Sequence, residues 1–132
     1  MKNFLEDDHY CFVCGEKNPE GLHVIFSLED GKVIANFTPQ KIHQGYKDII
    51  HGGIISTLLD EAMVKAALMQ GIPAVTAEIS VRFKNSLIVG EKVFIEASLI
   101  SMNRRIIEAS AVIKKADGII VAEGYAKLLK QD

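Results

Sequence analysis

The chain has 132 residues, of which 48% are hydrophobic and 24% are charged, and these values fit one ordinary domain with a single packed core. Its formal net charge is −2 and its Lys and Arg residues are scattered, so the composition does not indicate a surface for nucleic acid. The first eight residues are acidic without an apolar run, and no stretch is long and apolar enough to predict a membrane span. We expect one domain, residues 1–132, that is cytoplasmic and binds neither nucleic acid nor membrane.

The N-terminal segment, residues 1–21, is predicted to be a loop with a Cys-x-x-Cys motif at Cys11 and Cys14. In an intracellular chain this spacing indicates zinc or redox chemistry more readily than a structural disulfide. His9 and His23 would complete a Cys2His2 set, but no second close pair of ligands follows the motif. The segment also does not resemble the strand-to-helix junction of a redox motif. We therefore expect two reduced thiols in a loop, with no metal and no cofactor.

Two strands and one long helix are predicted in the first half of the chain. The strands cover residues 22–28 and 32–38, and Glu29-Asp30-Gly31 between them carries the Asp-Gly signal of a tight hairpin. Residues 39–50 are rich in turn formers and are predicted to be a loop. From Gly53 to about Gln70 apolar residues recur every three or four positions, which predicts a helix roughly 27 Å long. This apolar stripe consists of Ile55, Leu59, Ala62, Ala66 and Met69.

The second half of the chain is predicted to be all strand. Apolar and polar residues alternate over 75–84 with a period of two, and further strands are predicted at 93–100, 106–114 and 119–129. Turns are predicted at Gly90-Glu91, Asn103-Arg104 and Asp117-Gly118. Because no second helix is available for parallel crossovers, we expect successive hairpins in an antiparallel meander. One long helix on one face of a curled antiparallel sheet is an α+β architecture.

The sequence His51-Gly52-Gly53 directly precedes the long helix. Two glycines allow a ligand to approach the backbone closely, and the free N–H groups and partial positive charge of a helix start suit a developing anion. A simpler interpretation is that the glycine pair only forms a tight turn. For His51 we favour a bond to a neighbouring backbone group at the helix start over a role as a general base.

Two adjacent acids lie on different faces of this helix. Glu61 precedes Lys65 by four residues, which predicts an ordinary solvated surface pair. Asp60 has no cation at the equivalent position and lies in line with mostly small residues, namely Gly53, Ser56, Val64, Ala67 and Gly71. A water-facing carboxylate and a carboxylate at a subunit interface both fit Asp60. The small residues favour the interface, because a solvated stripe normally carries long polar side chains.

His51-Gly52-Gly53 followed by an acid nine positions after the histidine resembles the hotdog-fold acyl-CoA thioesterases, in particular the PaaI-like branch. The resemblance covers most of the chain and includes Cys11-Phe12-Val13-Cys14-Gly15, Asn18-Pro19-Glu20-Gly21-Leu22, Gln44-Gly45-Tyr46, Gly90-Glu91 and residues 117–122. It implies a hotdog fold, in which the sheet wraps the central helix. It also implies a homodimer formed by joining two sheets edge to edge, with active sites at the dimer interface, and the pairing of dimers into tetramers.

The resemblance also implies roles for individual residues. Asp60 is expected to act as general base or nucleophile, the Gly52 N–H to bind the thioester oxygen, and Thr76 to orient the water or the acid. Some relatives carry an orienting Asn where Gly45 stands here, and neighbouring Gln44 is expected to substitute for it. Further residues expected to bind substrate are His51, Gly53, Tyr46, Met63 and Phe83, together with Arg82 and Lys84 as contacts for the phosphates of CoA.

The expected function is therefore hydrolysis of an acyl-CoA thioester to free CoA and a carboxylic acid. A non-catalytic acyl-CoA or lipid-binding hotdog module remains an alternative, and it would bind acyl-CoA tightly without releasing thiol. A hotdog dehydratase or hydratase is a third class. Those enzymes pair a His with an acid in a different arrangement, and the spacing from His51 to Asp60 fits thioesterases better.

Overall fold

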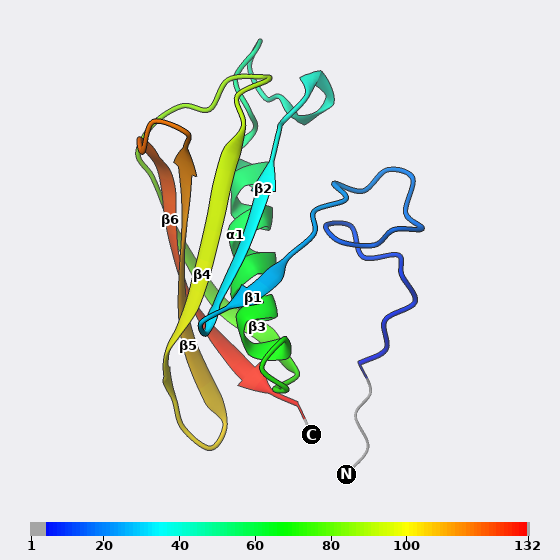
Figure 1. Ribbon diagram of the computed structural model, residues 1–132, viewed down its shortest axis with the longest axis vertical. Coiled ribbons are helices and arrows are strands. Elements are labelled where there is room, and N and C mark those ends of the chain that lie inside the picture. Colours follow the sequence, from blue (N-terminus) through cyan, green and yellow to red (C-terminus); the bar gives the residue numbers. More distant parts are fainter. Residues whose placement is uncertain (1–4, 132) are drawn as a thin grey trace.

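A six-stranded antiparallel sheet that wraps one long helix dominates the computed structural model, which describes residues 5–131 (Figure 1). The predicted α+β class with one central helix is confirmed. The elements in chain order are β1 (Ser27–Glu29), β2 (Lys32–Phe37), a 3-10 helix (Lys41–His43), α1 (Gly52–Leu68), β3 (Ala74–Phe83), β4 (Val93–Met102), β5 (Ile106–Lys115) and β6 (Ile120–Lys130).

Helix α1 forms where the apolar periodicity predicts it, and its buried face packs against the sheet. The buried residues are Ile55, Leu58, Leu59, Ala62, Met63, Ala66 and Ala67. The helix ends at Leu68 because Gly71 adopts a φ of +86°, and the Ile72 N–H then donates to the Ala67 carbonyl at 3.0 Å. Met69, predicted to belong to the buried stripe, instead caps the helix and is 37% exposed.

The sheet order is β1-β2-β4-β5-β6-β3. Strands β4, β5 and β6 form the predicted meander, but β3 pairs with β6 and occupies an edge, so the prediction of successive hairpins throughout is wrong there. The cause is the connection over residues 84–92. Leu87 in this connection is buried, and its carbonyl accepts a hydrogen bond from the Ile50 N–H at 2.8 Å. The connection therefore packs against the loop that leads into α1 and does not turn back as a hairpin.

The first hairpin forms as predicted, but its first strand is short. Asp30 and Gly31 both have positive φ, 52° and 78°, as a two-residue turn between strands requires. The predicted strand over 22–28 pairs only from Ser27 onward. Upstream, the Leu22 and Val24 N–H groups donate to carbonyls of the Cys-x-x-Cys loop, each at 2.8 Å, and are not available to the sheet.

Strand β3 contains an irregularity that changes which side chains face the helix. Thr76 pairs with Leu128 and Glu78 pairs with the adjacent Lys127, so Ala77 is an extra residue, a β-bulge. The predicted uninterrupted period of two is wrong at this point. As a result Thr76 faces α1, whereas Arg82, an even number of residues further on, lies on the opposite face of the sheet.

The segment that precedes β1 lies along the side of α1 away from β5 and β6 (Figure 1). Val13, Leu22 and Val24 anchor it by burying their side chains in the core. Within residues 5–131, no helix combines the length and the apolar character needed to cross a membrane.

Candidate active site

The start of α1 is stabilised by the side chain of His51. His51 is the N-cap residue, and its Nδ1 accepts a hydrogen bond from the Gly53 N–H at 2.8 Å. The His51 N–H in turn donates to the His43 carbonyl at 2.9 Å, which fixes the approach of the chain to the helix. The predicted bond from His51 to a neighbouring backbone group is confirmed. It occupies the Gly53 N–H, so that group is not open to a ligand.

The Gly52 N–H remains open. Gly52 is the first residue of α1, and no group among residues 5–131 accepts a hydrogen bond from its N–H. The Phe83 ring lies against this position, since a Cβ added at Gly52 would be 3.4 Å from the Phe83 Cζ. A free donor at the positive end of a helix, beside an apolar wall, can bind the oxygen of a polarised carbonyl.

Two hollows meet at Gly52. The larger, about 550 Å³, is lined by Gly45, Tyr46, Ile49, Ile50, His51 and Gly52. The smaller, about 290 Å³, shares Ile49, Ile50 and Gly52 with it and adds Ile55 and residues 83–87. The structure therefore brings Tyr46, His51, Phe83 and Lys84 around the open N–H. Tyr46 stands at the rim, because its side chain is 86% exposed.

Gln44 shapes the loop beside these hollows and does not line them. Its Oε1 accepts a hydrogen bond from the Asp48 N–H at 2.9 Å, and its backbone pairs with Ile50. These contacts close residues 44–50 into the loop that carries Tyr46. Gln44 is thus placed to support the loop, whereas the resemblance predicts an orienting contact for it.

Asp60 lies in the middle of α1 and is half-buried. The Thr76 hydroxyl donates to Asp60 Oδ1 at 2.5 Å, and the bulge at Ala77 is what turns Thr76 toward the helix. A hydrogen bond to an ionised acceptor is short and strong, so it fixes one carboxylate oxygen and leaves the other to bind water or substrate. No Lys, Arg or His among residues 5–131 forms an ion pair with Asp60.

The Gly52 N–H and the Asp60 carboxylate of one chain are too far apart to act on the same carbonyl group. Residues 52 and 60 are eight positions apart in a continuous helix, which separates them by about 12 Å along its axis. A general base and an oxyanion donor must each come within roughly 3 Å of the reacting groups. One chain therefore carries both functional groups without bringing them together.

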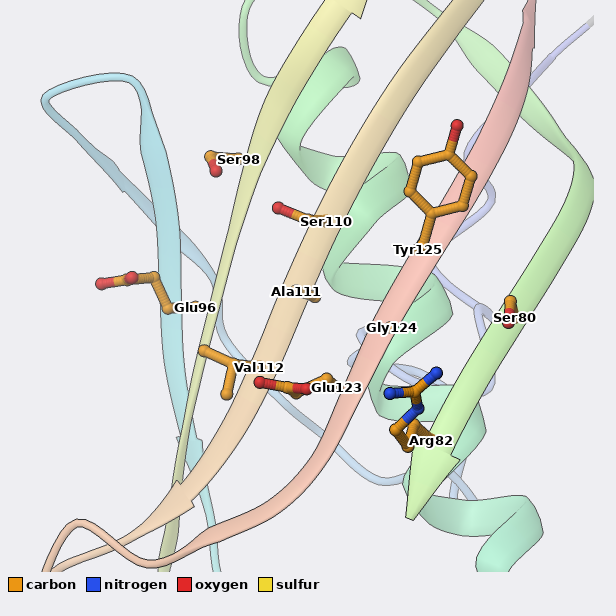
Figure 2. A pocket seen from close by; sticks show the side chains of 10 residues that line it. All are labelled: Ser80, Arg82, Glu96, Ser98, Ser110, Ala111, Val112, Glu123, Gly124 and Tyr125. Carbon is orange, nitrogen blue, oxygen red and sulfur yellow. The ribbon is translucent and has the colours of Figure 1, made fainter. Parts of the chain in front are cut away.

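Two other predicted site residues, Met63 and Arg82, lie away from Gly52. Met63 is fully buried, with its Cε 3.2 Å from the position of a Cβ at Gly124, and it lines none of the hollows described. Arg82 lines a polar hollow of about 430 Å³ on the sheet face away from α1 (Figure 2). Lys84 lines the smaller hollow at Gly52, and its Nζ is 3.2 Å from Glu123 Oε1. The predicted pair of phosphate contacts is thus divided between two sites.

A second cluster of functional groups was not predicted from the sequence. The Cys11 thiol donates to Glu61 Oε2 at 3.4 Å, and Glu61 is half-buried, so the expected solvated pair with Lys65 is wrong. Cys11 and Cys14 are both free cysteines. Burial and a hydrogen bond with Glu61 raise the pKa of the Cys14 thiol to about 12. Cys11 and Glu61 are fifty positions apart, and no local pattern indicates their contact.

Comparison with known proteins identifies the family. The family model described as the thioesterase superfamily matches residues 47–122, more than half of the chain, and the chain belongs to this family. A curated relative, acyl-coenzyme A thioesterase 13 from Homo sapiens, is 26% identical over 107 residues, which are 79% of this chain and 76% of that protein.

Solved structures share the fold. A thioesterase superfamily protein, RHA08564, superposes with a TM-score of 0.86 and 26% identity over 92% of this chain, which spans 60% of that protein. The PaaI protein of E. coli gives a TM-score of 0.77 with 20% identity over 83% of this chain and 80% of that one. The predicted hotdog fold and the resemblance to PaaI-like thioesterases are confirmed.

A further solved structure is a hypothetical thioesterase protein from Streptococcus pneumoniae TIGR4 with coenzyme A. It has a TM-score of 0.77 and 18% identity over 81% of this chain and 84% of that one. Two other structures of that protein carry alanine in place of an aspartate and of a threonine, at positions sixteen residues apart.

Proposed function

We propose that this protein is an acyl-CoA thioesterase whose active site is shared between two subunits. The observation that carries the proposal is that α1 contains both functional groups. Its first N–H, that of Gly52, is open, and its half-buried Asp60 carboxylate accepts a hydrogen bond from Thr76 of β3. Membership of the thioesterase superfamily and the similarity to a human acyl-coenzyme A thioesterase support thioester hydrolysis as the reaction.

In the reaction, the Gly52 N–H of one subunit would bind the thioester oxygen. Asp60 of the other subunit would take a proton from water as the water oxygen attacks the carbonyl carbon. The C–S bond then breaks, and the CoA sulfur leaves with the proton. One oxyanion donor contributes about 3 kcal/mol to such a step, and a general base contributes roughly a hundredfold or more. Asp60 acting as a nucleophile would use the same two groups.

The edge position of β3 supports a shared site. β3 is a ten-residue strand whose outer edge has no partner within residues 5–131, and Val75 and Ile79 on it are exposed. Such an edge readily pairs with another strand. Two β3 strands paired about a twofold axis would bring two α1 helices side by side, with the half-buried Ser56, Asp60 and Val64 between them. This arrangement would remove the separation of about 12 Å between donor and acid.

The pneumococcal variants support the roles of the two polar residues. The aspartate and the threonine replaced in those structures are sixteen residues apart, the same separation as Asp60 and Thr76. Coenzyme A in a structure of the same protein supports a CoA ester as the substrate. The pairing of dimers into tetramers and the cytoplasmic location stay predictions from the sequence.

A panel of short, long and aromatic acyl-CoA esters, assayed for free thiol, tests this function. We expect hydrolysis of at least one class, with Asp60→Asn and Asp60→Ala abolishing it while the dimer persists. Glu78→Gln is the matched control, because Glu78 is an exposed carboxylate on β3 that faces away from α1. Wild-type turnover by Asp60→Asn would refute the proposal. Tight acyl-CoA binding without thiol release would indicate the binding module.

A further inference from the structure

We propose that Cys11, Cys14 and Glu61 bind a zinc ion that fixes the N-terminal segment to α1. The ligand atoms of these three residues all lie within 4.8 Å of one another, and all three side chains are half-buried. Cys11 Sγ and Glu61 Oε2 are 3.4 Å apart. The site goes beyond thioester hydrolysis, because it lies outside the hollows around Gly52.

The spacing of the ligand atoms suits a tetrahedral metal. With Zn–S bonds of about 2.3 Å and Zn–O bonds of about 2.1 Å, neighbouring ligand atoms in a tetrahedron are roughly 3.6 Å apart. The distance of 3.4 Å from Cys11 Sγ to Glu61 Oε2 is close to this value, and every other pair of ligand atoms in the group lies within 4.8 Å. The protein thus holds three ligands close to the geometry of a zinc site.

The backbone of the Cys-x-x-Cys loop supports the same conclusion independently. The Gly15 N–H donates to the Cys11 carbonyl at 2.8 Å, which closes the turn that brings the two sulfur atoms together. The Val13 N–H lies 3.4 Å from Cys11 Sγ, as a hydrogen bond that supports a metal-bound thiolate would require. Only glycine fits at position 15 of this turn, because a Cβ there would lie 2.3 Å from the Cys11 backbone nitrogen.

The donor set selects the kind of metal. Two thiolates and one carboxylate are ligands typical of Zn²⁺, whereas Ca²⁺ and Mg²⁺ take oxygen ligands. The fourth tetrahedral position is left to water. His9, which the sequence offered as a further ligand, instead lies 3.6 Å from the carboxylate of Glu16, and neither His9 nor His23 belongs to the group formed within residues 5–131.

The site lies between the N-terminal segment and α1. Residues 5–26 contain no helix or strand, yet they contribute Val13, Leu22 and Val24 to the core. A metal shared by Cys11 and Glu61 would join this segment to α1 across fifty positions of sequence. Glu61 contacts the N-terminal segment while neighbouring Asp60 contacts Thr76 of β3, so the two acids serve different sites.

Metal content of the purified full-length chain tests the proposal. With a thiol-free reductant and no chelator, inductively coupled plasma mass spectrometry should find about one zinc per chain. Cys14→Ser and Glu61→Gln should each lower the zinc content at least tenfold. Glu20→Gln, which removes an exposed carboxylate of the same segment, should retain zinc and is the matched control.

A second measurement uses only the wild-type chain and does not depend on whether the variants fold. After chelator treatment in reductant, Co²⁺ should produce a thiolate-to-metal charge-transfer band and visible bands of tetrahedral intensity. The absence of both zinc and the cobalt bands would overturn the proposal, as would a Cys11–Cys14 disulfide that persists in reductant. Zinc content and cobalt affinity unchanged in Glu61→Gln would overturn the assignment of Glu61. Neither the zinc content nor the cobalt spectrum depends on hydrolysis, so the proposed function is tested separately.

Discussion

Replacing Gly52 with proline would remove one hydrogen-bond donor and add ring carbons beside Phe83 without disturbing the start of the helix. Proline is favoured at the first position of a helix, where its missing N–H has no intrahelical partner. The residue before a proline must be extended, and His51 already has φ −60° and ψ 132°. The cap from Gly53 to His51 Nδ1 does not involve the lost group. The Gly52→Pro variant is therefore expected to fold and to dimerise.

The expected loss of activity follows from the oxyanion contact. One donor worth about 3 kcal/mol corresponds to a decrease in kcat of roughly 10²- to 10³-fold. Gly52→Ala separates the effect of losing the N–H from the effect of adding carbon atoms at this position. It keeps the N–H and places a Cβ 3.4 Å from Phe83, an ordinary contact, so a smaller decrease is expected. Activity of Gly52→Pro equal to the wild type would refute the role of the N–H.

Mixing two inactive variants tests whether the site is shared. If each site takes Gly52 from one subunit and Asp60 from the other, a heterodimer of Gly52→Pro and Asp60→Asn contains one intact site. Random re-pairing after mild denaturation would then restore about a quarter of the wild-type rate per chain. Thiol release measured before and after mixing is the assay. No recovery, with heterodimers demonstrated by mass spectrometry, would refute the shared site.

Three further predictions concern positioning and stability. Thr76→Val should lower kcat about 10- to 100-fold, because it removes the hydroxyl that donates to Asp60, while Thr76→Ser should retain most activity. Equal rates for the two variants would contradict this role. Gly124→Ala should lower the free energy of unfolding by about 1 kcal/mol or more, because the new Cβ would lie 3.3 Å from Leu59 Cβ, which is bonded directly to the helix backbone, as well as 3.2 Å from Met63 Cε. An unchanged midpoint in urea would contradict the tight packing. Burial lowers the pKa of His43 below 6.5, so as the pH falls the unfolded state binds a proton before the folded state does. The free energy of unfolding should therefore be highest above pH 6.5 and decrease below it. The decrease between pH 7.5 and 5.5 should be smaller in His43→Asn.

The local features of the fold were predictable from local sequence. The period of the apolar residues places α1 within two residues of its observed ends, and Asp30-Gly31 forms the expected hairpin turn. Long-range features were not predictable in the same way. The edge position of β3 depends on how residues 84–92 pack against the loop before α1, and that contact has no periodic signal.

The candidate site divides in the same way. The open N–H of Gly52 and the cap by His51 follow from the glycine pair at a helix start. The contact between Thr76 and Asp60 was expected only from the family resemblance, because strict alternation along β3 would put Thr76 on the same face as Arg82. Glu61 was misjudged because its partner Cys11 is fifty positions away.

The extra residue in β3 also determines how substitutions along this strand should be interpreted. Ahead of Ala77 the even-numbered positions, Ala74 and Thr76, face α1, and beyond it the odd-numbered positions, such as Val81, do so. A saturation mutagenesis scan of the strand should therefore show sensitivity that changes phase by one residue at Ala77. Libraries designed on a fixed alternation would randomise the wrong face in one half of the strand.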